Sequence, residues 1–142
     1  GSFSIILPKR DNSGMKIDNH LYQKYIKKIN RNFGGSSTYP SVLGCFKNKE
    51  TKRTECEPNF EVKAFRDFSD APSKLTQESK KKVLNKDYLF MQKIAKDAGN
   101  EFGQTAMLII RDDIDEVSYV KTKRRKHLDQ GKIYEDFFNR EI

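Results

Sequence analysis

Apolar residues change their spacing from one segment of the chain to the next, and each spacing predicts an element. The apolar run FSIILPK at residues 3–9 predicts a first strand. In residues 21–33 the apolar positions recur at steps of three and four, which predicts an amphipathic helix. Asp18 or Asn19 can cap its start, and the glycines at 34–35 stop it. The chain therefore begins with a strand followed by a helix.

The middle of the chain has the pattern of a β-hairpin. Residues 36–46 are rich in β-formers, and Pro40 removes one backbone donor, which favours an edge strand. A charged turn at 48–53 leads to residues 54–65, which alternate polar and apolar toward their end. This second segment is predicted to be the partner strand of the first.

A second helix and a fourth strand follow the hairpin. After a loop at 67–74, apolar residues at steps of three and four continue to Phe102 and predict a long helix that begins at Leu75 or Ser79. The segment TAMLIIR at 105–111 predicts the most apolar strand. The order of elements is thus β α β β α β.

This order predicts an α+β fold of the ferredoxin-like βαββαβ type, in which a four-stranded antiparallel sheet carries two helices on one face. We assign this domain to residues 1–120, where VSYV at 117–120 is a candidate extension of the sheet. Residues 121–142 form a basic C-terminal tail. Ile133 and Phe137 lie one helical step apart, so we expect the tail to be partly helical.

The two halves of this plan resemble each other, because Phe-Gly follows both helices and Arg-Asp follows the first and third strands. We expect these two strands to lie parallel in the centre of the sheet, which would bring both Arg-Asp pairs to the same end. Two arginines there can hold a carboxylate or a phosphate, although each can equally pair with a neighbouring acid. Together with two hairpin residues, the candidate cleft consists of Arg10, Asp11, Tyr39, Glu57, Arg66 and Asp67.

Basic residues are concentrated on the predicted helices and the tail. The chain of 142 residues has a formal net charge of +8, and residues 21–34 carry four bases and no acid. Such a surface is either simply solvated or contacts nucleic acid or an acidic partner. Nucleic-acid binding of this kind is led by phosphate contacts, weakly sequence-specific and strongly salt-dependent. The candidates are Lys24, Lys27, Lys28, Arg31, Lys80, Lys81, Lys82, Lys123, Arg124, Arg125 and Lys126.

Motifs for catalysis or metal binding do not stand out. The sequence has no P-loop, no nucleotide-binding glycine motif and no nucleophile elbow. RDDIDE at 111–116 lacks the glycine and terminal glutamate of a calcium loop. We therefore expect no metal and no cofactor, assign no catalytic residue and leave enzymatic activity open. Cys45 and Cys56 are interpreted first as two buried thiols, or else as a cross-strand disulfide because both flank one turn.

The sequence gives no sign of a membrane segment. No apolar run approaches the roughly 18 residues that a membrane span requires. FSIIL, near the start, is too short for a secretory signal. These observations predict a cytoplasmic protein.

The first and fourth strands are apolar on both faces, whereas a sheet with one face in water alternates cleanly. Ile6 opposes Phe3 and Ile5, and Leu108 opposes Ile109. We therefore expect the face away from the helices to be covered by a second copy of the chain or by the tail. A homodimer through this open face is the preferred interpretation, since it would bury apolar surface.

Several segments together resemble a group of small ferredoxin-like proteins: ILPKRDNSG, NFGGSSTYPSVLGCF, TECE and EFGQTAMLIIRDD. The resemblance covers about residues 3–120 and is loose. More distantly, the plan is similar to dimeric α+β-barrel proteins, which include small monooxygenases and ligand-binding domains. The leading hypothesis is a small binding or accessory protein that acts through its basic surface. The resemblance implies the alternative, a small-molecule enzyme or ligand-binding protein of the dimeric α+β-barrel type.

Overall fold

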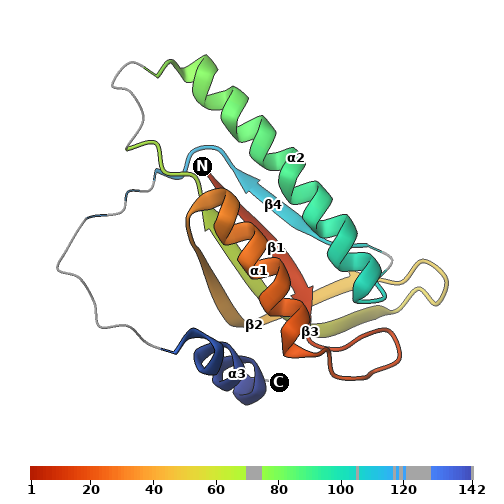
Figure 1. Cartoon of the computed structure of the whole chain (residues 1–142). Helices are drawn as coiled ribbons and strands as arrows, with labels where there is room; N and C mark the ends of the chain where they lie inside the picture. Colours follow the sequence, from red (N-terminus) through yellow and green to blue (C-terminus); the bar gives the residue numbers. More distant parts are fainter. Residues whose placement is uncertain (70–74, 105, 117, 119, 121–128, 142) are drawn as a thin grey trace.

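The computed structural model describes residues 1–69, 75–104, 106–116, 118, 120 and 129–141. They form an α+β structure with a four-stranded antiparallel sheet (Figure 1). The elements in chain order are β1 (Ser2–Pro8), α1 (Asn19–Phe33), β2 (Ser36–Lys47), β3 (Thr54–Phe65), α2 (Gln77–Glu101), β4 (Ile109–Asp112) and α3 (Gln130–Glu141).

The strands are arranged in the order β2-β3-β1-β4, and every neighbouring pair is antiparallel. Ser2 of β1 lies opposite Phe65 of β3, and Pro8 lies opposite Asn59. The expectation that the first and third strands run parallel is therefore wrong. The reason is the β2–β3 hairpin, because β3 reverses direction after β2 and then inserts beside β1.

Two prolines fit this sheet by position. β2 is an edge strand, as Pro40 predicts, and its register with β3 shifts between Tyr39 and Val42, on either side of this proline. Pro58 lies in the central strand β3 but just past the β1–β3 ladder, where its carbonyl accepts a hydrogen bond from the Lys9 amide at 3.4 Å. Neither proline removes a donor that the β1–β3 ladder requires.

The predicted boundaries of α1 are confirmed. The Asp18 side chain caps the helix by accepting a hydrogen bond from the His20 amide at 2.9 Å. Gly34 ends it with φ of 86°, a left-handed conformation that glycine adopts without strain. For α2 the cap is Thr76, whose side chain accepts from the Ser79 amide, so this helix begins between the two predicted starting points.

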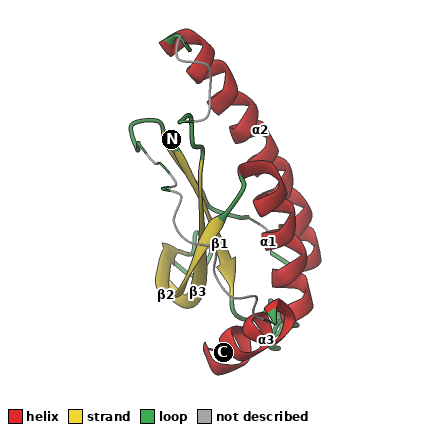
Figure 2. Ribbon diagram, turned by 60° about the vertical axis from the view of Figure 1, so that its left-hand side comes forward, coloured by secondary structure: helices red, strands yellow, loops and turns green. Residues whose placement is uncertain are grey.

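The core lies between the sheet and the helices. α1 contacts β2 and β3, whereas α2 contacts β1 and β4. Figure 2 shows these two long helices beside the sheet and α3 near its lower end. The buried strand side chains alternate along each strand, as expected for one core-facing side: Phe3, Ile5 and Leu7 of β1 with Phe60, Val62 and Ala64 of β3.

The described part of the tail is helical, as the spacing of its apolar residues predicts. Phe138 of α3 is buried and stacks on Tyr22 of α1, with ring centroids 4.7 Å apart. It also meets Phe60 of β3 edge-on at 5.1 Å. Because Phe60 belongs to the core-facing side of the sheet, α3 extends the core beside α1 and does not cover the opposite face.

The sheet face that points away from this core, which we call the open face, is partly apolar and exposed. Leu108 is 57% exposed, Ile110 46% and Tyr39 45%. β4 is shorter than predicted and begins later, although the Leu108 carbonyl still accepts from the Ile6 amide at 3.1 Å. Residues 117, 119 and 121–128 lie outside the described residues, and with them part of the predicted sheet extension and of the basic tail.

None of the helices in the described ranges is both long enough and apolar enough to cross a bilayer. Within the same residues, no group of three or more His, Cys, Asp or Glu side chains is placed to hold a metal ion.

Candidate functional site

The two Arg-Asp pairs do not form one cleft. Arg10 follows the end of β1, whereas the Arg66 amide donates to the Gly1 carbonyl, beside the start of β1, at 2.9 Å. The seven-residue strand between them spans about 20 Å, since a strand rises about 3.3 Å per residue. An antiparallel sheet therefore places the two pairs at opposite ends, so the expectation that they lie at the same end is wrong, and they cannot share one anion.

The first pair shapes a turn. The Asp11 carboxylate accepts hydrogen bonds from the Ser13 hydroxyl and from the amides of Ser13 and Met15, at 2.7–3.0 Å. The hydrogen bond from the Ser13 hydroxyl is the main reason that the pKa of Asp11 lies below its ordinary value. The Arg10 guanidinium donates to the Gly14 carbonyl at 3.1 Å. These contacts stabilise the loop before α1.

Arg66 of the second pair forms a partly buried ion pair with Asp87 of α2, and not with its neighbour Asp67. The Arg66 guanidinium donates to both carboxylate oxygens of Asp87, at 2.7 and 2.8 Å, and to the Asn32 carbonyl at 3.0 Å. The side-chain amide of Asn32 donates to the same carboxylate at 3.1 Å. Asp87 is only 4% exposed. Arg66 thereby joins the end of β3 to α1 and α2, and the bidentate geometry is the favourable one for this pair.

The other cleft candidates are dispersed. Tyr39 lies on the open face opposite Glu61, and Glu57 lies opposite Gly44 in the hairpin. The Asp67 carboxylate accepts from the Ser69 amide at 2.8 Å, in the loop after β3. Glu57 lies toward the hairpin turn, Tyr39 pairs near the middle of β3, and Arg66 and Asp67 follow the end of β3.

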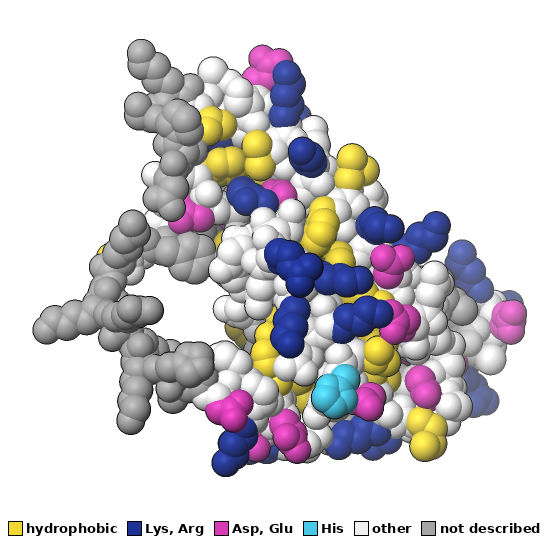
Figure 3. Space-filling model, in the orientation of Figure 1, with side chains coloured by type: hydrophobic (Ala, Val, Ile, Leu, Met, Phe, Trp, Pro, Cys, Tyr) yellow, Lys and Arg dark blue, Asp and Glu magenta, His cyan; other side chains and the backbone are white. Residues whose placement is uncertain are grey.

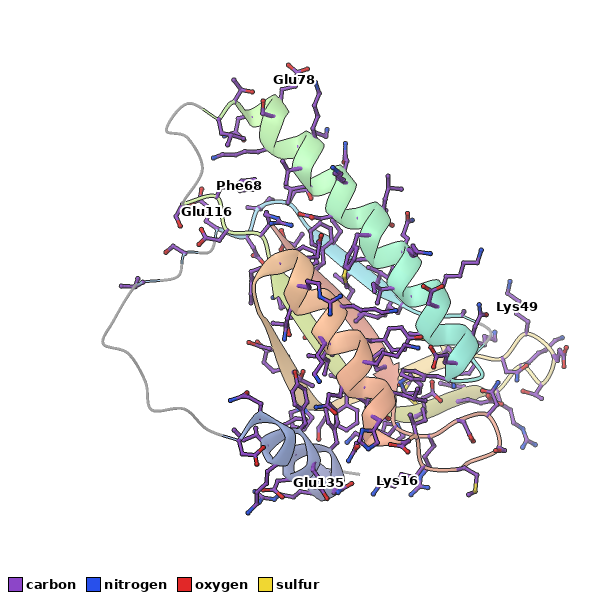
Figure 4. The ribbon with its side chains drawn as sticks, in the orientation of Figure 1. Lys16, Lys49, Phe68, Glu78, Glu116 and Glu135 are labelled. Atoms are coloured by element: carbon purple, nitrogen blue, oxygen red, sulfur yellow. A yellow bond between two sulfur atoms is a disulfide. The ribbon has the colours of Figure 1, made fainter. Side chains whose placement is uncertain are left out.

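A cavity of about 530 Å³ lies at the Arg66 end of the sheet, and we call it the upper cavity. One wall is the N-terminal part of α2, with Lys80, Lys81 and Leu84. The opposite wall consists of the segments after β3 and β4. Figure 4 shows Phe68 and Glu116, which belong to these segments and both line the cavity, beside the start of α2.

The basic candidates of α1 converge with α2 on a second hollow, which we call the helix groove. It has a volume of about 360 Å³, and its bases are Lys28, Arg31 and Lys93. Phe90 and Ile94 form its apolar lining. Figure 3 shows Lys and Arg side chains spread over α1 and α2, with hydrophobic side chains between them. The helix groove thus combines an apolar floor with a rim of three bases and one acid, Asp97.

The bases of this face differ in how far neighbouring acids neutralise them. Arg31 is exposed and makes no ion pair among the described residues, whereas Lys93 approaches Asp97 at 3.8 Å. Lys24 pairs closely with Glu101, which also accepts a hydrogen bond from the buried Tyr25 hydroxyl. Lys24 is therefore a weaker candidate for binding an anion than Arg31.

The remaining basic candidates separate into three groups. Lys80 and Lys81 line the upper cavity, whereas Lys27 and Lys82 are exposed on their helices and line neither hollow. The basic run at 123–126 lies outside the described residues. The structure therefore divides one predicted basic surface between two separate hollows.

Cys45 and Cys56 lie opposite each other in the hairpin and form a disulfide, with their Cα atoms 4.0 Å apart. Both residues are exposed. The first interpretation, two buried thiols, is therefore wrong, and the cross-strand alternative is confirmed. The apolar pattern misleads here because this end of the hairpin extends past β1 and past the core.

The sequence did not single out three residues of these sites: Asp87, Phe90 and Lys93. Asp87 carried a usable signal, because it lies three residues after Leu84 on the buried side of an amphipathic helix. A charged side chain at such a position needs a partner. The partner, Arg66, is distant in sequence, so the pair becomes visible only in the folded chain.

No family model matches the chain, and no curated protein matches it. Among solved structures, a phage SAM lyase in complex with S-methyl-5'-thioadenosine is similar, with a TM-score of 0.48 and 13% identity over 76% of each chain. A phage SAM lyase in the apo state gives 0.44 and 14%, over 76% of this chain and 75% of that one.

Proposed function

We propose that this protein is a binding protein whose helical face contacts nucleic acid through the helix groove. The observation that carries this proposal is the composition of α1, which has four bases and no acid and lies beside Lys93 of α2. Binding rests on phosphate contacts from Lys28, Arg31 and Lys93, and it discriminates weakly between sequences.

The shape of the groove favours a single strand over a duplex. Its apolar floor, with Phe90 half-buried, offers an aromatic edge and aliphatic surface to an unpaired base. Its rim offers positive charge to the flanking phosphates. A duplex keeps its bases stacked inside, so it would use the rim alone.

Fluorescence anisotropy of a labelled single-stranded oligonucleotide of mixed sequence tests this proposal. Three phosphate contacts predict a slope of about −2 for the logarithm of affinity against the logarithm of salt. Affinity should then fall by about an order of magnitude between about 50 and about 200 mM salt. In the variant Lys28→Gln/Arg31→Gln/Lys93→Gln, both the affinity and the slope should decrease.

A matched control removes three bases from the hairpin turn: Lys47→Gln/Lys49→Gln/Arg53→Gln. Both variants lose the same net charge, so a larger loss of affinity in the groove variant would show that binding is local to the groove. Equal weakening in the two variants would show a diffuse charge effect and contradict the groove. Absence of binding at low salt would reject nucleic acid as the partner, and binding of a polyglutamate peptide would identify an acidic protein instead.

The arrangement of the elements supports a finer description of the fold. We propose a ferredoxin-like domain with both helices on one face. The strand order β2-β3-β1-β4 and the contacts of α1 with β2 and β3 and of α2 with β1 and β4 support this proposal. On this description the open face is available to a second copy. Leu108, Ile110 and Tyr39 are exposed there, and we propose a homodimer that covers them.

The upper cavity supports a second candidate function, the binding or conversion of a small molecule. Its volume of about 530 Å³ falls within the range of ligand sites, and it contains basic, acidic and aromatic side chains. This candidate uses other residues than the helix groove, so the oligonucleotide experiment leaves it unaffected.

A further inference from the structure

The upper cavity is lined by charges of both signs. Arg66 and the N-terminal ammonium of Gly1, which donates to the Asp115 carbonyl at 2.6 Å, lie between two charged segments. Lys80 and Lys81 project from α2, whereas Asp113, Asp115 and Glu116 belong to the segment after β4. This mixture of bases on α2 and acids after β4 differs from the helix groove, where bases predominate.

Several of these charges are already satisfied by the protein. Arg66 is held by Asp87, and Asp113 accepts two hydrogen bonds from Arg111, at 2.5 and 3.0 Å. Asp115 accepts from the Ser2 hydroxyl at 2.6 Å and lies 3.7 Å from the Lys63 ammonium. These groups form the frame of the cavity and have little capacity left for a ligand.

The remaining charges are available. The positive charge of Lys81 contributes to lowering the pKa of Asp113, but the two side chains form no ion pair. The Lys80 ammonium lies 5.6 Å from the centroid of the Phe68 ring. Glu116 is exposed and has no ion pair or hydrogen bond within the described part of the chain. The cavity lining therefore includes two lysine ammonium groups and one carboxylate that form no ion pair among the described residues.

The surface between these charges is apolar. Leu84 of α2 and Ile114 after β4 line the cavity together with the ring of Phe68. An apolar or aromatic group can pack against them, while polar ends reach the walls.

We propose that the upper cavity binds a small zwitterion of the amino-acid class with an apolar side chain. The carboxylate of this ligand is held by Lys80 and Lys81, and its ammonium group by Glu116. Its side chain packs against Phe68 and Leu84. The walls favour both charges on one molecule, because an anion alone leaves Glu116 unpaired and a cation alone faces two lysines.

Three probes that share a benzyl group isolate the role of each charge. L-phenylalanine carries both charges, 3-phenylpropanoate lacks the amine, and 2-phenylethylamine lacks the carboxylate. Each is titrated into the ¹⁵N-labelled full chain, and amide shifts are followed by NMR. L-phenylalanine should shift amides at 66–69, 77–84 and 113–116. It should also bind about tenfold more tightly than either analogue, since each analogue loses one charge-assisted contact.

Substitutions then assign the two walls. Lys80→Gln/Lys81→Gln should weaken the amino acid and 3-phenylpropanoate about tenfold but should not weaken 2-phenylethylamine, whose like-charged neighbours it removes. Glu116→Gln should weaken the amino acid and the amine only. The matched control is Lys82→Gln/Lys86→Gln, which removes two exposed bases of α2 that do not line the cavity.

Three outcomes would overturn the zwitterion proposal. One is that none of the standard L-amino acids shifts these amides at millimolar concentration. Another is equal affinity for L-phenylalanine and 3-phenylpropanoate, which indicates a simple anion site. The last is equal weakening by the cavity variant and the control variant. None of these results bears on the helix groove, so the nucleic-acid proposal is judged separately.

Discussion

The contact between Arg66 and Asp87 shows how one residue pair joins three elements. Asp87 belongs to α2, and Arg66 directly follows β3. The Arg66 guanidinium also donates to the backbone carbonyl of Asn32, near the end of α1. Removing one partner of a buried pair leaves the other charge desolvated and unpaired. The pair is therefore important for stability whether or not the neighbouring cavity binds a ligand.

We expect Asp87→Ala to lower the free energy of unfolding by about 3 kcal/mol or more, because Arg66 is left without its counter-charge. Urea unfolding followed by circular dichroism measures this change. Asp97→Ala is the control, since it removes the partly exposed partner of Lys93 and should cost less than about 1 kcal/mol. Similar losses of stability in both variants would contradict a larger contribution from the Arg66–Asp87 pair.

Glu101 gives the stability of the fold a component that depends on pH. Hydrogen bonds, first from Lys24 and then from the Tyr25 hydroxyl, hold the pKa of Glu101 below its ordinary value of 4.5. A carboxyl with a lowered folded-state pKa stabilises the fold at neutral pH. This contribution is lost as the pH falls below 4.5 and through the folded-state pKa.

The variant Glu101→Gln should therefore be less stable than the wild type at neutral pH, and the difference should shrink in acid. Urea unfolding of both proteins across the acidic range measures the difference directly. Since the other carboxyl groups are common to both proteins, their titration cancels. A difference that stays constant or grows in acid would contradict this role of Glu101.

At the scale of elements, the β2–β3 hairpin is the part of the fold that depends least on the core. Its ladder continues beyond Asn59, where pairing with β1 ends, to Lys47 and Thr54. Leu43 is 72% exposed in this extension. Strand pairing and the disulfide between Cys45 and Cys56 are therefore the main constraints on its geometry.

Cys45→Ser/Cys56→Ser should lower the free energy of unfolding by about 2–3 kcal/mol, because the crosslink restricts the unfolded chain. Reduction of the wild type should produce the same loss and should accelerate tryptic cleavage at Lys49 and Lys52. Dithiothreitol should have no effect on the double variant, which serves as the control. Equal stability of the oxidised and reduced wild type would contradict the prediction.

At the scale of the whole molecule, the open face bears on whether the chain forms a homodimer. Buried side chains of α1, α2 and α3 belong to one core cluster with Phe3, Ile5 and Leu7 of β1. Apolar side chains of β1 and β4 face the other way, beside Glu61 and Lys63 of β3. An interface with two-fold symmetry can match these two charges with each other, since each subunit offers both signs.

Sedimentation equilibrium should show a concentration-dependent dimer for the wild type, and Leu108→Lys/Ile110→Lys should shift it to monomer. Two charges placed in a buried apolar interface cost more than dimerisation returns. Leu89→Lys is the control, because Leu89 is 65% exposed but lies on α2. A wild type that stays monomeric at high concentration would reject the homodimer.

The sequence by itself determined most of the elements, because their signals are local. The cap at Asp18 and the stop at Gly34 bound α1 through hydrogen bonds and φ within a few residues. Pro40 marked an edge strand because it lacks a donor. The start of α2 and the extent of β4 were less accurate, since caps and strand ends also depend on neighbouring elements.

The tertiary structure alone decided which chemistry-bearing residues meet. The antiparallel pairing of β1 and β3 separated Arg10 from Arg66, and helix packing gave Arg66 a partner 21 residues further along the chain. The same packing divided the basic residues between the helix groove and the upper cavity. The physical reason is that strand direction and helix packing are set by long-range contacts, which the spacing of residues along the chain does not encode.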